Sequence, residues 1–169
     1  MRVSVGSLRS ALFLVAALLA CGHLAADELR GRVVGITDGD TVTVLTPARI
    51  QKKVRLAGID APEKGQPFGQ ASKRQLSELA FQRDVSVQWN KEDRFGRIVG
   101  VIIVNGDDVG LSLLRSGFAW HFKRYAHEQS STDRAAYAKA EEQAQAARVG
   151  LWRDPQPVPP WQYRSNRRH

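Results

Sequence analysis

One short segment constrains the fold of this chain more than any other. Residues 54–63 have the sequence VRLAGIDAPE, an apolar strand that contains Arg55 and ends at two acids, Asp60 and Glu63. A charged side chain in a largely buried strand is costly unless it has a partner, so Arg55 requires an anion close by. Acids at the end of a strand can bind a metal ion, position water or simply face solvent. We therefore expect the remaining strands to form a barrel around this segment.

The first 26 residues predict a secretory signal. Arg2 and Arg9 flank a mostly apolar run at residues 11–20, and small residues follow it. This order of positive, apolar and small residues is typical of signal peptides, and the run is too short to span a bilayer comfortably. The alternative is a buried N-terminal strand or helix. We expect the protein to be exported, either secreted or held in the cell envelope (periplasm).

Two cleavage sites are compatible with this leader. Residues 18–21 (LLAC) resemble a lipoprotein box, in which Cys21 would be lipidated and anchor the protein in a membrane. Cleavage after Ala26 would instead release a soluble protein. We favour the soluble form, because Leu19 is not the small residue usual at that position. A structural lipoprotein of the envelope is an alternative that rests on Cys21 alone.

The cysteine content excludes an internal disulfide, and the net charge indicates which kinds of partner the protein could bind. Cys21 is the only cysteine, so no internal disulfide can form. The formal net charge is +8, and removing Arg2 and Arg9 with the leader leaves +6. A positive charge of this size favours nucleic acid or an anionic membrane as partner. The 169 residues, 43% of them hydrophobic, fit one domain, which we place at residues 27–153. We expect a monomer, and the sequence implies no protein partner.

Alternating apolar residues and turn signals predict five strands and three helices. Asp38-Gly39 lies between two alternating runs and is a strong turn signal, and Gly117 and Gly150 are expected to end two helices. The expected strands are residues 30–36, 42–46, 50–58, 84–89 and 98–104, and the expected helices are 69–82, 109–115 and 132–149. This order predicts an α+β, mainly β fold, a five-stranded oligonucleotide-binding (OB) barrel with about three packed helices.

The remaining segments are expected to be irregular. Residues 118–125 mix aromatic and basic side chains in a link between helices. Residues 154–169 form a basic tail whose several prolines we expect to exclude a helix or a central strand. The end of this tail, residues 164–169, is expected to be mobile.

Three carboxylates form a candidate metal site. Asp40 begins the second expected strand, whereas Asp60 and Glu63 follow the third, so antiparallel pairing would bring them together. Crowded carboxylates need a cation, and oxygen ligands without His or Cys suit Ca²⁺ or Mg²⁺. The main-chain carbonyl of Ala61 could complete the shell. Asp38 has an outer role or serves the turn, and each aspartate taken singly is more often only a turn residue.

Two arginines are candidates for binding a phosphate. Arg55 and Arg97, beside a cation, would clamp a phosphodiester and stabilise the charge that develops during attack by water. Glu63 would be a general base or would position the water, and a metal ion lowers the pKa of its bound water. The alternative is that Arg55 pairs structurally with Asp60 or Glu63 and that Arg97 lies on the surface.

Other aromatic and basic residues are weaker candidates for substrate binding. Trp120, His121 and His127 could touch bases, although packing between helices is the more common role for such residues. Lys123, Arg124 and the basic tail could add non-specific phosphate contacts, or could form a solvated basic face. Tyr125 and Phe95 complete the set of substrate-binding candidates.

Three segments resemble signature sequences of the thermonuclease family, the staphylococcal (micrococcal) nuclease type. They are TDGDT at residues 37–41, RLAGIDAPE at 55–63 and DRFGR at 93–97, and the similarity extends over residues 31–152, including SLLRSGFA at 112–119 and GLW at 150–152. The resemblance implies a Ca²⁺-dependent phosphodiesterase that acts on DNA and RNA and leaves 3′-phosphate ends. It implies metal ligands at Asp40, Asp60 and the Ala61 carbonyl, and catalytic roles for Arg55, Glu63 and Arg97.

The sequence also departs from that family. Ala61 replaces a threonine of that family. Because the implied metal ligand at this position is the main-chain carbonyl, the substitution should have little effect on metal binding. Phe95 replaces a tyrosine near the substrate phosphate, the loop between Glu63 and Phe68 is shorter, and residues 120–125 differ. These changes affect substrate preference rather than the reaction. The alternative function is a non-catalytic OB-fold domain that binds single-stranded nucleic acid.

Overall fold

Five strands form a closed barrel whose inner face is lined by buried apolar side chains. The computed structural model describes residues 27–167. The barrel strands are β1 (Asp27–Ile36), β2 (Thr41–Leu45), β3 (Gln51–Leu56), β5 (Asp84–Glu92) and β6 (Ile98–Val104). In β6 buried and half-buried residues alternate strictly from Ile98 to Val104, as expected for a strand with one face in a core.

The strand order is β3-β2-β1-β5-β6, and a parallel pairing of β3 with β6 closes the barrel. The register shifts once in β1 and once in β5, consistent with bulges that bend strands at barrel corners. Gly100 allows close contact between β6 and β5, since a Cβ there would lie 2.8 Å from the carbonyl oxygen of Gln88. The predicted five-stranded barrel is thereby confirmed.

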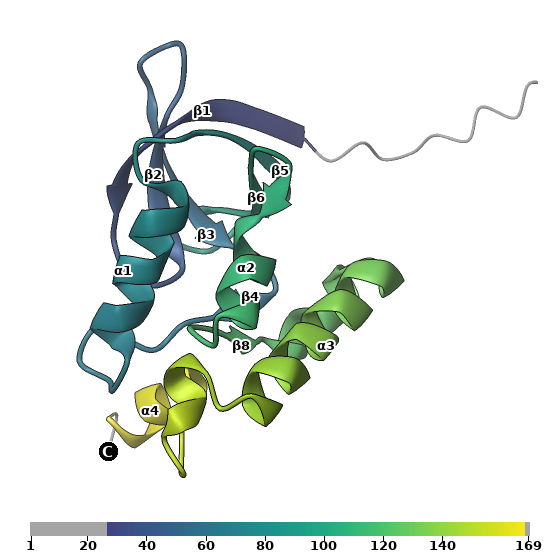
Figure 1. Cartoon of the computed structure of the whole chain (residues 1–169). Coiled ribbons are helices and arrows are strands. Elements are labelled where there is room, and N and C mark those ends of the chain that lie inside the picture. The colour runs from purple at the N-terminus through teal and green to yellow at the C-terminus, as the bar shows by residue number, and fades with distance from the viewer. Residues whose placement is uncertain (1–26, 168–169) are drawn as a thin grey trace, which may run out of the picture.

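Four α-helices surround the barrel, and short elements join them (Figure 1). The α-helices are α1 (Gly69–Ala80), α2 (Val109–Arg115), α3 (Ser131–Ala146) and α4 (Pro160–Asn166). The short elements are β4 (Ile59–Asp60), β7 (Asp107–Asp108), β8 (Trp120–His121) and the 3₁₀ helices Lys123–Glu128 and Gly150–Arg153. Buried residues of the first three helices, such as Leu76, Leu113 and Tyr137, join the barrel core.

Local capping fixes where two of these helices begin and end. Asp108 accepts a hydrogen bond from the backbone of Leu111 at the start of α2, and Ser130 caps α3 in the same way through Asp133. Gly117 follows α2 in a left-handed conformation, as expected. Helix α3 ends earlier than expected, at Ala146, because Arg148 rather than Gly150 first adopts the left-handed conformation after the helix.

The expectation of an irregular link at residues 118–125 is wrong. Trp120–His121 forms β8, which pairs with β4 so that Trp120 lies opposite Asp60. The backbone N–H of Phe122 also donates to the carbonyl oxygen of Gly58 at 2.8 Å. These main-chain bonds were not evident from the mixed aromatic and basic composition. They hold the end of the signature segment at residues 54–63 against the helical layer.

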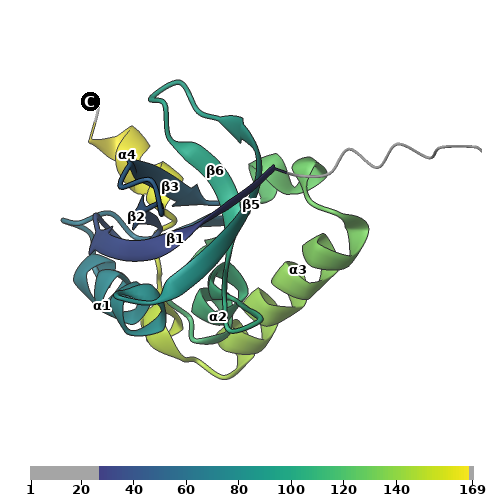
Figure 2. The same cartoon turned by 90° about the horizontal axis from the view of Figure 1, so that it is seen from above.

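The expectation that prolines exclude a helix from the tail is also wrong. Pro160 is the first residue of α4, where its fixed φ suits a helix and its missing N–H costs nothing. Residues 164–166 therefore belong to a helix rather than to an irregular tail. Figure 2 shows α4 well separated from α3.

None of the helices between residues 27 and 167 combines the length and hydropathy that crossing a membrane requires. The expected leader at residues 1–26, with the lipoprotein box ending at Cys21, lies outside the described residues.

Candidate active site

Arg55 lies between two carboxylates, one from the turn before β2 and one from β4. Its Nη1 atom is 2.8 Å from Oδ2 of Asp40, and its Nη2 atom is 2.9 Å from Oδ1 of Asp60. The antiparallel β2–β3 register explains the first contact, because Arg55 lies opposite Thr41, the residue that follows Asp40. Nη1 also donates to the carbonyl oxygen of Ile59 at 3.1 Å. A single guanidinium thus joins both aspartates that the sequence marks as metal ligands.

The third predicted ligand, Ala61, lies at the same corner. Its backbone N–H donates to Oδ2 of Asp40 at 2.9 Å, and the hydroxyl of Thr41 donates to Oδ1 of the same carboxylate. Asp40, Asp60 and Ala61 are all buried. The structure therefore brings together two buried carboxylates and the main chain of Ala61, as expected from the antiparallel strands.

Glu63 lies at the rim of this corner. Its backbone N–H donates to Oε1 of Gln66 at 3.1 Å, which fixes the loop before α1. Its own carboxylate is half-exposed and does not contact Arg55; instead Oε1 lies 2.7 Å from Nη1 of Arg164. Within residues 27–167 no three His, Cys, Asp or Glu side chains are grouped in a way that would by itself hold a metal ion. The carboxylates here converge on guanidinium groups.

Arg164 is a site residue that the sequence alone did not reveal. It lies on α4, and its Nη2 atom is 2.8 Å from Oδ2 of Asp60 while Nη1 bonds Glu63. From the sequence, Arg164 was expected only to belong to a basic tail with non-specific phosphate contacts. The one signal that could have found α4 is Pro160, because proline is favoured at the first position of a helix.

Arg97 shares a face of the sheet with Arg55 but has a different partner. Ile98 and Val54 are register partners in the parallel β6–β3 pair and both are buried, so the residues beside them, Arg97 and Arg55, lie on the outer face. Arg97 donates through Nε to Oδ2 of Asp93 at 2.8 Å. The structure thus places the two arginines on one wall of the barrel, with Arg97 held by its own turn.

Burial and neighbouring charge shift several pKa values at this corner. Burial, together with the nearby charge of Asp40, raises the pKa of Asp38 to about 6. Burial also raises the pKa of Asp60, while the hydrogen bond from Arg164 and the charge of Arg55 act in the opposite direction. Burial alone would lower the pKa of Arg164, but its hydrogen bonds to Asp60 and Glu63 raise it above the ordinary value.

Phe95, one of the candidate substrate-binding residues, is 68% exposed. It lies at the tip of the turn between β5 and β6, and the guanidinium groups of Arg94 and Arg97 are 4.8 and 5.6 Å from the centre of its ring. An exposed ring between two cations can stack with a base while the cations contact phosphates.

The other candidates fall into two groups. Tyr125 and Arg124 are exposed, and the Arg124 guanidinium lies 5.8 Å from the Tyr125 ring. Lys123 is exposed as well, but its ammonium pairs with the buried carboxylate of Glu141 at 2.7 Å. His121 is buried, and its Nε2 atom forms a hydrogen bond with Gln129. It therefore packs inside the protein and does not contact bases.

A pocket of about 490 Å³ adjoins the site. Its walls include the aromatic rings of Trp120, Phe122 and Trp161, and Arg164 links it to the acidic corner. A second hollow of similar size, about 500 Å³, lies between Arg32, Pro47 and Ser86. This second hollow is more open, and none of the candidate site residues lines it. We therefore place the chemistry at the acidic corner, although the two hollows have similar volumes.

Comparison with known proteins identifies relatives of this chain. A family model described as "Staphylococcal nuclease homologue" matches residues 53–154. An "uncharacterized endonuclease" of Haemophilus influenzae is 41% identical over 93% of this chain and 83% of its own length. A "micrococcal nuclease" of Shigella flexneri is 38% identical over 81% of each chain. "Protein ParB" of Escherichia coli is 37% identical over 99% of this chain and 97% of its own.

Proposed function

Because the chain belongs to the family of staphylococcal nuclease homologues, and is therefore a hydrolase that acts on nucleic acids, we propose that it is a Ca²⁺-dependent endonuclease. It cleaves phosphodiester bonds in DNA and RNA with little sequence specificity and leaves 3′-phosphate ends. The observation that supports this most strongly is the position of Arg55, whose guanidinium contacts Asp40 and Asp60 beside Ala61.

The chemistry of the donor atoms fits Ca²⁺. Asp40 and Asp60 offer carboxylate oxygens and Ala61 offers a carbonyl oxygen, all of them hard donors of the kind Ca²⁺ prefers. Both carboxylates are buried and both contact one guanidinium, so a single cation can serve them together. When bound, Ca²⁺ would supply positive charge beside the reacting phosphate and would lower the pKa of water.

The chain's own side chains supply the remaining roles. Arg55 has five N–H donors, so it can hold Asp60 and still donate to a phosphate oxygen. Arg97, on the same wall of the barrel, provides the second guanidinium for the charge that develops in the transition state. Glu63 is half-exposed at the rim, where its carboxylate can orient the attacking water and accept its proton. In-line attack then breaks the bond from phosphorus to the 5′-oxygen, which takes up a proton from solvent and leaves as a 5′-hydroxyl.

We also propose that the protein acts outside the cytoplasm. The support is the leader at residues 1–26, with Arg2 and Arg9 around an apolar run. An exported, non-specific nuclease would meet nucleic acid without endangering the genome of the cell that makes it.

Digestion of DNA and of RNA with and without Ca²⁺ tests the function. Cleavage should require Ca²⁺, stop with a chelator, and yield fragments with a 3′-phosphate and a 5′-hydroxyl. Activity that survives chelation would exclude the metal role, and 5′-phosphate ends would exclude the proposed direction of attack. Tight binding of single strands without any cleavage would instead support the non-catalytic OB-fold domain.

A further inference from the structure

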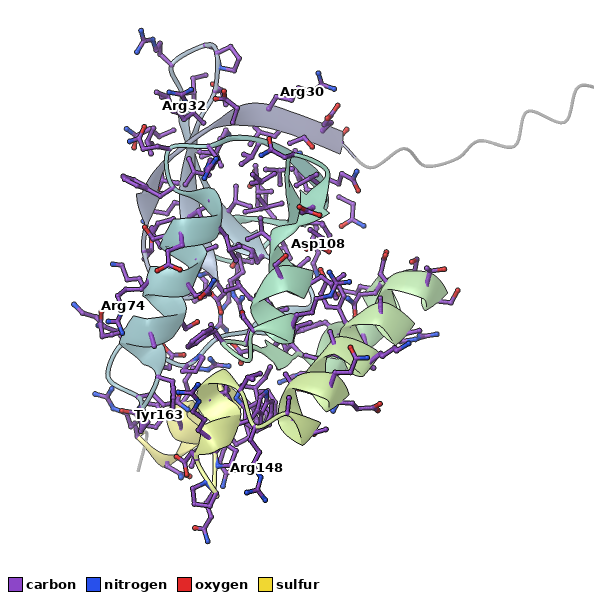
Figure 3. All side chains as sticks on the ribbon, in the orientation of Figure 1. Arg30, Arg32, Arg74, Asp108, Arg148 and Tyr163 are labelled. Carbon is purple, nitrogen blue, oxygen red and sulfur yellow. The ribbon has the colours of Figure 1, made fainter. Side chains whose placement is uncertain are left out.

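The C-terminal helix α4 and the residues just before it are held over the acidic corner by contacts at three places. The side chain of Gln66 donates to the carbonyl oxygen of Val158 at 2.6 Å, and the hydroxyl of Tyr163 donates to that of Gly65 at 2.8 Å. The ring of Trp161 stacks on Phe122, with centroids 5.7 Å apart. Figure 3 labels Tyr163 on α4, beside the loop that precedes α1. Helix α4 is thus docked on the loop that carries Glu63.

This docking places Arg164 on the carboxylates of the site. Its Nη2 atom lies 2.8 Å from Oδ2 of Asp60, and its Nη1 atom lies 2.7 Å from Oε1 of Glu63. Because Arg55 occupies Oδ1 of Asp60 at 2.9 Å, both oxygens of this buried carboxylate accept hydrogen bonds from guanidinium groups. Each oxygen of Asp60 keeps a lone pair that a cation could use, but a divalent cation there would lie against two guanidinium groups, and the repulsion between like charges favours release of one of them.

Arg164 is more easily displaced from Asp60 than Arg55 is. The side chain of Arg55 is 16% exposed and is also held by Asp40 and by the carbonyl oxygen of Ile59. The side chain of Arg164 is 37% exposed, lies on the last helix of the chain, and has Asp60 and Glu63 as its partners. Water can solvate the partly exposed guanidinium of Arg164 once it is displaced. Displacing Arg55 would instead leave its charge without a partner in a largely buried site.

We propose that Arg164 is a built-in competitor of the divalent cation, and that it sets the cation concentration at which the site fills. The inference rests on the proposed Ca²⁺ site. In the absence of cation, the guanidinium neutralises Asp60 and Glu63 and keeps the corner ordered. Binding of the cation displaces Arg164 from Asp60, and this displacement frees the Glu63 carboxylate at the same time. The family match ends at residue 154, so α4 adds this control from outside the matched segment.

Calorimetric titration of the full chain with Ca²⁺, without substrate, tests the proposal. Arg164→Ala should tighten Ca²⁺ binding by about tenfold or more, since a competing charge–charge hydrogen-bond pair is removed. Arg164→Lys should tighten it less, because lysine keeps the charge but loses the two-pronged contact. Arg167→Ala is the matched control, since it removes the same charge from the end of the same helix. It should change the dissociation constant by no more than about twofold, the scale of screened surface charge.

Other results overturn the inference. Binding that is weaker in Arg164→Ala, or equal to that of Arg167→Ala, would mean that Arg164 organises the site or acts only as general charge. If Arg164→Ala fails to fold, Arg164→Gln provides the same test, because it removes the charge but keeps most of the bulk of the side chain. It should also tighten Ca²⁺ binding by more than the control does, and no change would count against the proposal. Failure of the wild-type chain to bind Ca²⁺ would defeat the proposed function itself, whereas tight wild-type binding with indifferent variants would defeat only the role of Arg164.

Discussion

The Nη1 atom of Arg55 lies 2.8 Å from Oδ2 of Asp40, across the first residues of the β2–β3 pair. Arg55 is therefore both a candidate phosphate ligand and the cation that offsets buried negative charge in the folded protein. The first role affects turnover and the second affects the stability of the fold. Substitution of Arg55 should change both quantities, and measuring them with and without Ca²⁺ should distinguish the two roles.

Arg55→Ala should lower turnover by about a hundredfold or more, the scale for loss of one donor to the transition state. It should also lower the free energy of unfolding by about 3 kcal/mol, because Asp40 and Asp60 lose a shared partner in a buried position. Urea unfolding with and without Ca²⁺ measures the second effect. Added Ca²⁺ should restore much of the stability without restoring turnover, and recovery of turnover as well would remove Arg55 from the chemistry.

Arg97→Ala should also lower turnover by about a hundredfold, but with little effect on stability. Its ion pair with Asp93 is partly exposed and local, four residues apart in sequence, and such pairs contribute about 1 kcal/mol or less. Arg94→Ala, which removes an exposed arginine from the same turn, is the control: it should raise KM through loss of a phosphate contact but leave turnover within a few-fold of wild type. Steady-state kinetics on a defined oligonucleotide compares the two. Equal effects would indicate general attraction to phosphate rather than a specific role for Arg97.

Phe95→Ala should raise KM for single-stranded substrate by about tenfold, since stacking of one base is worth roughly 1–3 kcal/mol. Phe95→Tyr should keep KM close to wild type, because the stacking face is retained. Neither change should alter stability appreciably, given that the side chain is 68% exposed. A KM that is insensitive to the loss of the ring would exclude Phe95 from the substrate-binding surface.

Gly69→Ala should reduce activity through Glu63. A Cβ at Gly69 would clash with the carbonyl oxygen of Glu63, far inside van der Waals contact. The loop that carries Glu63 would therefore have to move. Overpacking of this kind costs about 1–3 kcal/mol, and we expect turnover to fall by at least tenfold. Gly65→Ala in the same loop is the control, because its Cβ would be 3.5 Å from the nearest neighbour, the Tyr163 hydroxyl. Thermal unfolding and turnover of both variants provide the comparison.

Tyr137→Phe should destabilise the fold without impairing the site. The Tyr137 hydroxyl donates to Oδ2 of Asp108 at 2.6 Å, and Asp108 also caps α2 (Figure 3 labels Asp108 at the start of this helix). Loss of a hydrogen bond to a charged, half-buried acceptor should cost about 2 kcal/mol. Tyr163→Phe loses an exposed hydroxyl contact and should cost about 0.5 kcal/mol or less. Urea unfolding measures both, and equal losses would mean that the Asp108 contact contributes nothing special.

Much of the barrel could be predicted from sequence because its determinants are local. A nearly continuous apolar run indicated β6 at residues 98–104, and the boundaries of α2 matched the expected residues 109–115. The strand at residues 54–56 and the acids after it indicated the corner occupied by Arg55 and Asp60. Elements without a local signal were missed. Helix α4 was excluded on account of its prolines, and β8 was not expected because its two residues gain their order only by pairing with β4.

The sequence determined which chemical groups this protein has and, through the period of its apolar residues, that a barrel would carry them. Only the tertiary structure decided which groups meet. Arg164 and Asp60 are 104 residues apart, and their contact depends on how α4 packs against the loop at residues 63–67. Local propensity can predict that a helix or strand forms, because it depends on neighbouring residues. It cannot predict the partner of a buried carboxylate, because that pairing is set by the packing of elements far apart in the chain.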